Sequence, residues 1–110
     1  MDKRLLGRSG IEVSPLGMGC WAIGGVWQFL DIQAGWGEVD DAESIRAVQH
    51  ALASGINFFD TAATYGTGHS ERIVGKALAG RRSEAVIATK FGFNVNDAGK
   101  FVTRFDTPEQ

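Results

Sequence analysis

The sequence predicts an α/β fold in which parallel strands are covered by helices. Three short, nearly continuous apolar runs predict buried strands, at residues 16–21, 56–59 and 85–89. Such runs are typical of parallel strands, whereas strands with one solvated face alternate apolar and polar residues. Amphipathic helical patterns separate the three runs, as expected of βαβ units. Asp60 and Lys90 directly follow the second and third runs, where (β/α)8 enzymes carry their chemistry.

The first 38 residues predict a hairpin, one strand and a long loop. Residues 5–13 contain two short strand-like segments around a turn of glycine and serine, which predicts a small β-hairpin. Ser14 and Pro15 end it, and the first apolar run follows. Residues 22–38 are rich in glycine and tryptophan without a helical or strand period, so we expect a loop there.

Two helices are expected between the later strands. Asp40 is the expected N-cap of the first, because Glu43 follows three residues on, and Gly55 suits its left-handed end. One face of this helix carries apolar side chains at helical spacing: Ala42, Ile45, Val48 and Leu52. The second helix is expected from about Ser70 to Ala79, closed by Gly80.

The composition bounds the classes of partner. The net charge of −2 argues against nucleic acid or an anionic membrane. The first residues, MDKRL, lack the apolar run that is typical of a signal peptide, and no apolar stretch approaches the ~18 residues needed to cross a bilayer. The single cysteine, Cys20, fits a reducing compartment. One cysteine and two histidines are too few to form a metal-binding pattern. We therefore expect a cytoplasmic protein; its oligomeric state stays open.

The last residues predict a helix start, with Thr107 as N-cap and Pro108 at the first helical position. The 110 residues are well short of the ~250 of a complete barrel. A parallel sheet with an open edge is also a poor place for a domain to stop. We therefore expect residues 1–110 to be a partial domain, truncated at its C-terminus.

Several segments together resemble one enzyme family. Residues 55–66, GINFFDTAATYG, and 70–78, SERIVGKAL, resemble the N-terminal signature of aldo-keto reductases. Residues 16–21, LGMGCW, resemble the first barrel strand of that family, and residues 89–92, TKFG, its third. The chain is thus similar to about the first three βα units of the family. This resemblance implies the N-terminal part of a (β/α)8 TIM barrel, preceded by the short β-hairpin.

The resemblance also implies an activity, the NADPH-dependent reduction of aldehydes or ketones to alcohols. Three residues of the family's catalytic tetrad fall on Asp60, Tyr65 and Lys90, and its histidine follows a fourth strand that these 110 residues do not contain. A small-molecule carbonyl is the implied substrate. The nicotinamide end of NADPH is implied to contact four residues: Gly19, Cys20, Trp21 and Asp60.

The three tetrad residue types suit this chemistry. A carbonyl oxygen must receive a proton as hydride reaches its carbon, and a tyrosine, with a reference pKa near ~10, keeps its proton at neutral pH. A nearby ammonium favours the tyrosinate and so eases proton loss. We expect Tyr65 to be the general acid, assisted by Lys90, with Asp60 holding the ammonium in place.

Other patterns have more ordinary interpretations. The Gly17-x-Gly19-x-x-Ala22 spacing formally fits a Rossmann fingerprint, but no helix follows it directly, so we exclude that fold. Ser70-Glu71-Arg72 is better explained by helix capping and a local ion pair than by phosphate binding, and His69 could cap the same helix. Cys20 is expected to be a small buried residue rather than a nucleophile.

Some alternatives stay open. Trp21 could line the substrate pocket or anchor its loop, and Trp27 and Trp36 could contact substrate or pack. A regulatory NADPH-binding protein of the same fold, like the potassium-channel β subunits, is an alternative to an enzyme. An inactive fragment is a third possibility.

Overall fold

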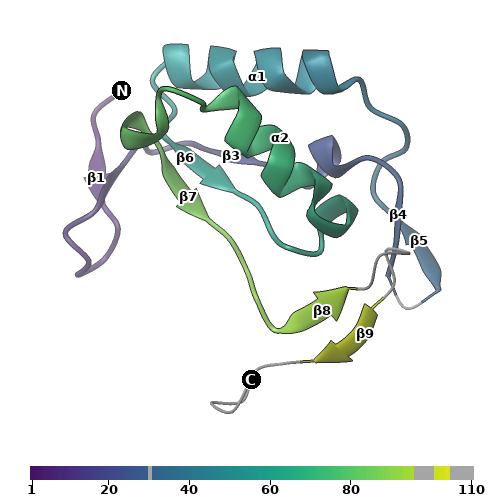
Figure 1. The fold of residues 1–110 in the computed structure, drawn as a ribbon. Helices are drawn as coiled ribbons and strands as arrows, with labels where there is room; N and C mark the ends of the chain where they lie inside the picture. Colours follow the sequence, from purple (N-terminus) through teal and green to yellow (C-terminus); the bar gives the residue numbers. More distant parts are fainter. Residues whose placement is uncertain (30, 96–100, 105–110) are drawn as a thin grey trace.

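The computed structural model describes residues 1–29, 31–95 and 101–104 (Figure 1). Its centre is a parallel sheet of three short strands in the order β3-β6-β7. These strands are β3 (Gly17–Gly19), β6 (Phe58–Asp60) and β7 (Val86–Ala88). They lie within or at the end of the three predicted apolar runs, so the α/β fold with a parallel sheet is confirmed, and Asp60 lies at the C-terminal end of its strand, as expected.

Helix α1 (Asp41–Ala53) begins and ends where its local signals predict. The backbone N–H of Glu43 donates to Asp40 Oδ1 at 3.0 Å, and Gly55 adopts φ +98°. The face prediction was wrong at Ala42, which is exposed, while Ser44 is buried. The reason is geometric: two residues turn a helix by about 200°, so Ala42 lies away from the stripe that contains Ser44 and Val48.

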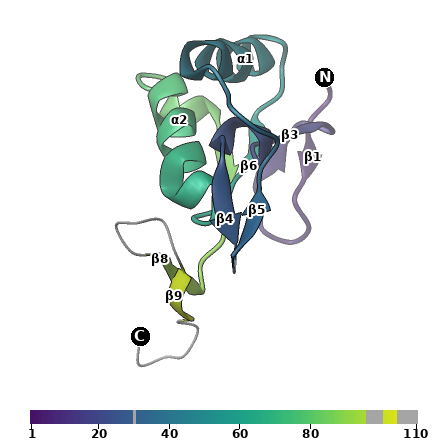
Figure 2. The same cartoon turned by 90° about the vertical axis from the view of Figure 1, so that its right-hand side faces the viewer.

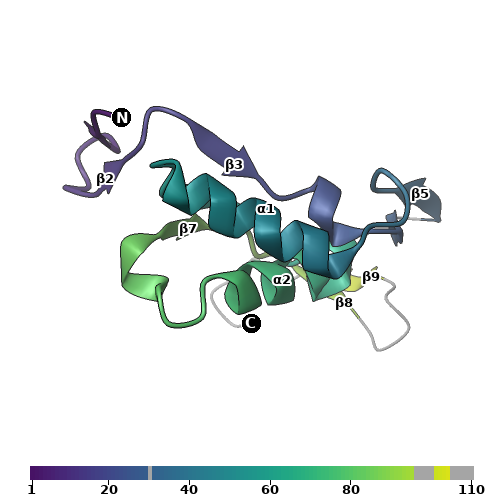
Figure 3. The ribbon, with the colours of Figure 1, turned by 90° about the horizontal axis from the view of Figure 1, so that it is seen from above.

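Helix α2 (His69–Ala77) packs beside α1 on the same side of the sheet (Figures 1 and 3). It ends two residues before the predicted Ala79, and Gly80 then takes φ +78°. The core lies between these helices and the sheet. Its largest fully buried apolar side chains are Phe59, Ile73, Leu78, Val48 and Val74.

Two hairpins flank the sheet (Figure 2). The first, β1 (Arg4–Leu5) with β2 (Glu12–Val13), confirms the predicted N-terminal hairpin. The second, β4 (Trp27–Phe29) with β5 (Ile32–Ala34), lies within the segment predicted as a loop, so that prediction was wrong there. Strands of three residues are too short to show an alternating pattern, which is why the sequence conceals them.

The rest of that segment includes a 3₁₀ turn at Ala22–Gly24. Because β3 runs into this turn rather than into an α-helix, the exclusion of a Rossmann fingerprint is confirmed. A further antiparallel pair, β8 (Phe93–Val95) and β9 (Phe101–Arg104), follows β7 and was not predicted. The expected helix start at Thr107 and Pro108 lies outside the described residues. Within the described residues, no helix combines the length and apolarity needed to cross a membrane.

Candidate active site

The parallel sheet brings the ends of its three strands to one edge. Gly19, Asp60 and Ala88 are in register across β3, β6 and β7. The ladder continues one residue further, because the N–H of Cys20 donates to the Asp60 carbonyl and that of Thr61 to the Ala88 carbonyl, each at 2.8 Å. Residues that follow these strands are therefore held close together by backbone hydrogen bonds.

Lys90 lies two residues after β7 and joins the predicted residues into one cluster. Its Nζ donates to Asp60 Oδ1 at 3.1 Å, to the Tyr65 hydroxyl at 3.3 Å and to the Thr61 carbonyl at 2.8 Å. An ammonium has three N–H donors, so each of them has an acceptor. The structure thus brings together the three residues that the sequence analysis selected.

These contacts determine the charge of Lys90. Partial burial acts to lower the pKa of its ammonium, but hydrogen bonds to Asp60 and to Tyr65 outweigh this effect and raise that pKa above its ordinary value. The lysine is therefore positively charged at neutral pH. The side chains of Lys90 and Asp60 remain about half exposed, at 51% and 50%, so the ion pair is open to solvent on one side.

The Tyr65 ring lies among two indoles and the ammonium. Its centroid is 5.2 Å from that of Trp21 and 6.4 Å from that of Trp27, with tilted planes. The two indoles are themselves 5.3 Å apart in an edge-to-face arrangement. Lys90 Nζ lies 4.9 Å from the centre of the phenol ring, within the range of a cation–π contact. The tyrosine is thus contacted through its ring as well as through its hydroxyl.

A polar network under the site links the strand ends to helix α2. Ser70 Oγ is fully buried, donates to the Cys20 carbonyl at 2.6 Å and lies 2.9 Å from Thr61 Oγ1. Because Thr61 also accepts from Lys90, the network supports the backbone to which the ammonium is bonded. Sequence reasoning missed this role of Thr61 and Ser70, because their partners are distant in the chain.

Three expectations for the start of α2 were wrong. Its N-cap is Gly68, with no side-chain capping bond, since Ser70 turns inward to Cys20. Glu71 accepts from the Thr89 hydroxyl at 2.6 Å instead of pairing with the adjacent arginine. His69 does not cap the helix either, because its Nε2 lies 2.7 Å from Asp41 Oδ1 at the start of α1.

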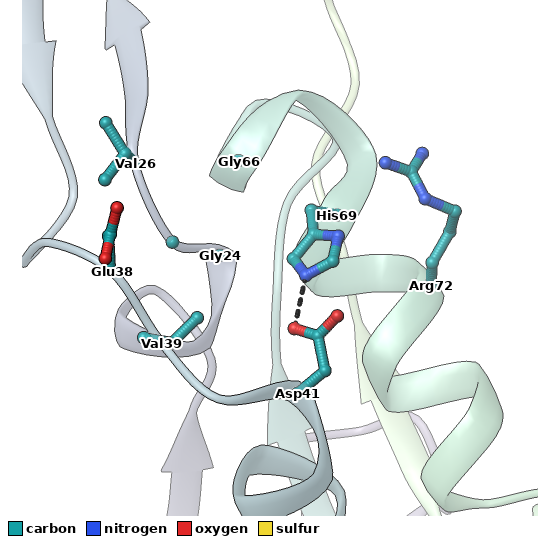
Figure 4. A pocket seen from close by; sticks show the side chains of 9 residues that line it. Gly24, Val26, Glu38, Val39, Asp41, Gly66, His69 and Arg72 are labelled. Atoms are coloured by element: carbon teal, nitrogen blue, oxygen red, sulfur yellow. Dashed lines mark hydrogen bonds and ion pairs between the residues drawn. The ribbon is translucent and has the colours of Figure 1, made fainter.

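His69 and Asp41 both line an open pocket of about 500 Å³ (Figure 4). The pocket lies next to the 3₁₀ turn Tyr65–Gly68, which contains the tyrosine. Arg72 points away from the pair, while Gly24 and Gly66 lie close together on another side. The pair holds the starts of the two helices together. Among the described residues, no group of three or more His, Cys, Asp or Glu side chains is arranged to hold a metal ion.

Of the residues expected to contact the nicotinamide, three are accessible. Gly19 and Asp60 line a cavity of about 570 Å³ over the sheet, and space above Gly19 is open. Trp21 is 39% exposed. Cys20 is fully buried, as expected, and burial together with the nearby Asp60 carboxylate raises the pKa of its thiol to about 11. An open surface of glycine beside an acidic residue suits a flat amide-bearing ring, so this site fits the group.

Comparison with known proteins identifies the family. The model of the aldo/keto reductase family matches residues 15–105. The chain belongs to the aldo/keto reductase family. Among similar proteins, an aldo-keto reductase of Bacillus subtilis is 42% identical over 82% of this chain and 25% of its own length. The versiconal hemiacetal acetate reductase of Aspergillus parasiticus is 40% identical over the whole chain and 31% of its own length.

Solved structures of aldo-keto reductases agree with the fold of this chain. The holo form of an aldo-keto reductase from Bacillus halodurans has a TM-score of 0.74 and 36% identity, over 94% of this chain and 30% of that protein. A glycerol dehydrogenase from Gluconobacter oxydans has a TM-score of 0.61 and 41% identity, over 84% of this chain and 25% of that protein. This member of the family therefore has a partial (β/α)8 barrel fold and spans between a quarter and a third of these relatives' length.

Proposed function

We propose that the protein containing this chain is an NADPH-dependent oxidoreductase that reduces aldehydes or ketones to alcohols. The observation that carries this proposal is the contact of one ammonium, that of Lys90, with both the Tyr65 hydroxyl and the Asp60 carboxylate. A phenol that must release a proton needs a positive neighbour, and that neighbour needs a fixed place. Membership of the aldo/keto reductase family supports the same reaction.

In this proposal each of the three side chains has a separate task. Tyr65 donates its hydroxyl proton to the carbonyl oxygen in reduction and recovers it in the reverse oxidation. Lys90 stabilises the phenolate that remains. Asp60 and the Thr61 carbonyl hold the ammonium within reach of the hydroxyl, at 3.1 and 2.8 Å.

When bound, NADPH would supply the hydride. On this chain Gly19, Trp21 and Asp60 would hold its nicotinamide end, whereas Cys20 is fully buried, backbone included, and would lie behind them without touching the ring. A Klebsiella pneumoniae family member solved with NADP and acetate is 23% identical, which supports the shared fold alone. NADPH therefore remains part of the proposal.

The test uses the full-length protein, with 4-nitrobenzaldehyde as a generic substrate and NADPH oxidation followed at 340 nm. Tyr65→Phe removes only the hydroxyl, and we expect kcat to fall at least about 100-fold, since general acid catalysis contributes that much or more. Quenching of protein fluorescence by NADPH should be unchanged in this variant. A kcat close to that of wild type would refute the assignment of Tyr65.

A second function, in a different class, has one specific observation in its favour. A rice protein named "Probable voltage-gated potassium channel subunit beta" is 36% identical over 90% of this chain. Regulatory NADPH binding without turnover is the corresponding proposal. The same assay separates the two functions, because a regulatory protein would bind NADPH and oxidise none of it in the presence of the aldehyde.

A further inference from the structure

The β4–β5 hairpin contributes one buried indole to the molecule. Trp27 is only 6% exposed, whereas Ile32 is 69% exposed and Trp36, just beyond the hairpin, 82% exposed. Of these three side chains, Trp27 is the one that packs the hairpin onto the molecule. The reaction proposed above gives this residue no task.

The backbone of the hairpin is shaped to hold the Trp27 ring. Gly35 follows β5 with φ +85°, and a Cβ built there would lie 3.1 Å from Trp27 Cδ1 and would overlap the Gly25 carbonyl. Only glycine allows such a close approach at this backbone conformation. The indole thus lies directly against the returning strand and has little room to change its rotamer.

On its other side this fixed ring meets the proposed general acid. The centroids of Trp27 and Tyr65 are 6.4 Å apart, and Trp21 contacts both rings. Trp21 is 39% exposed and can meet a substrate, but Trp27 is buried behind it. Trp27 can therefore act on the reaction through the rings of Trp21 and Tyr65, which it contacts.

The backbone of Tyr65 is held by a separate contact. Gly66 and Thr67 follow it with positive φ, at +59° and +53°. A Cβ on Gly66 would overlap the carbonyl oxygen of Gly24, so the tyrosine turn lies tightly against the 3₁₀ turn after β3. With the backbone held in this way, the direction of the hydroxyl depends on the two side-chain torsions of Tyr65.

We propose that Trp27 is a positioning residue, which holds the Tyr65 ring in the orientation that brings its hydroxyl to Lys90. The β4–β5 hairpin is the element that carries this indole to the site. The inference rests on the proposed function for its effect on turnover. Its structural part, the control of the Tyr65 ring, can be measured independently.

The kinetic test compares three variants of the full-length protein. Trp27→Leu should lower kcat by roughly 10- to 100-fold, the scale of a misplaced catalytic group, with KM for NADPH within about twofold of wild type. Trp27→Phe keeps an aromatic ring and should recover kcat to within about threefold of wild type. Ile32→Ala is the control, a truncation at an exposed position of the same hairpin, and should leave kcat unchanged. Wild-type kcat in Trp27→Leu would overturn the inference.

A spectroscopic test separates this inference from the proposed function. In protein labelled with 3-fluorotyrosine, the ¹⁹F resonance of Tyr65 is identified by its loss in Tyr65→Phe. Loss of the indole ring current shifts this resonance whatever the Tyr65 ring does, so the readout is the linewidth and the number of resonances. Trp27→Leu should broaden or split the resonance, because the Tyr65 ring then samples more than one orientation, and Ile32→Ala should leave one narrow resonance. If wild type shows no turnover, the proposed function fails, but a broadened or split resonance in Trp27→Leu still supports ring control and one narrow resonance refutes it. If Trp27→Leu does not fold, the same measurement on Trp27→Met decides in the same way.

Discussion

Lys90 is the residue on which the candidate site depends most. Its ammonium contacts a carboxylate, a backbone carbonyl and a phenol, which belong to β6, to the residue after it and to the turn before α2. The pair with Asp60 is half exposed, so it contributes little to folding stability and mainly sets the positions of charges. One prediction at this scale concerns that charge, and a second concerns the buried neighbour Cys20.

The charge of Lys90 should stabilise the fold only below strongly alkaline pH. The pKa of Lys90 is raised in the folded state. Its contribution to the free energy of unfolding is therefore complete below the pKa of the unfolded chain, about 10.4, and is lost as pH rises through the pKa of the folded protein. Urea unfolding of wild type and Lys90→Met from pH 7 to 11.5 should show a constant difference up to about pH 10, which shrinks above it. A difference that already disappears between pH 7 and 9 would contradict this.

Cys20 should be nearly inert to alkylation in the folded protein. The pKa of its thiol rises from 9.0 to about 11, so the fraction present as thiolate at pH 8 falls about 100-fold. Full burial slows access of the reagent to the sulfur further. Iodoacetamide labelling, followed by peptide mass spectrometry, should modify Cys20 at least about 100-fold more slowly than in protein unfolded with urea. Equal rates in the two states would show that the cysteine is accessible.

Among the elements, the N-terminal hairpin is joined to the sheet by a single side chain. Asn57, just before β6, accepts from the Ser14 N–H at 2.6 Å, and its own N–H donates to Ser14 Oγ at 3.0 Å. Its Nδ2 donates to the Glu12 carbonyl at 3.1 Å. The N-terminal hairpin is thus bonded to the sheet through one buried amide.

Removal of this amide should destabilise the protein measurably. Asn57→Ala leaves the buried N–H of Ser14 without its acceptor, which costs about 1–3 kcal/mol in free energy of unfolding. The control is Ser9→Ala, which removes two exposed turn bonds, one to the Leu6 carbonyl and one from the Ile11 N–H, and should cost less than about 0.5 kcal/mol. Urea unfolding checks both, and equal losses would show that Asn57 does not join the hairpin to the sheet.

For the molecule as a whole, much apolar surface is exposed. Twelve large hydrophobic side chains among the described residues are exposed, including Leu16, Trp36 and Phe91. Where such side chains form a contiguous patch, they mark a surface that other structure covers. The relatives are three to four times longer than this stretch, which spans 25% and 31% of the first two.

Residues 1–110 expressed alone should therefore expose apolar surface and lack turnover. We expect strong enhancement of 8-anilinonaphthalene-1-sulfonate fluorescence, and no oxidation of NADPH with 4-nitrobenzaldehyde, since the fourth tetrad residue of the family is not in this segment. The full-length protein is the control and should bind little dye. Turnover by the short chain would show that Asp60, Tyr65 and Lys90 suffice.

The features that depend on neighbouring residues could be predicted from the sequence. Asp40 caps α1 through Glu43, three residues away, and Gly55 and Gly80 take left-handed conformations that favour glycine. The apolar runs predicted the parallel sheet, and that order of strands placed Asp60 and Lys90 at one edge. The family signature supplied Tyr65, because its place in the turn follows a motif rather than a period.

The distant residues that support the site could be identified only from the folded structure. Ser70 bonds to Cys20, 50 positions away, and so does not cap its own helix, while His69 turns to Asp41, 28 positions away. Trp27 reaches Tyr65 because a hairpin too short to show a period folds over the strand ends. Such contacts depend on how elements pack in space, and no local spacing or propensity records that packing.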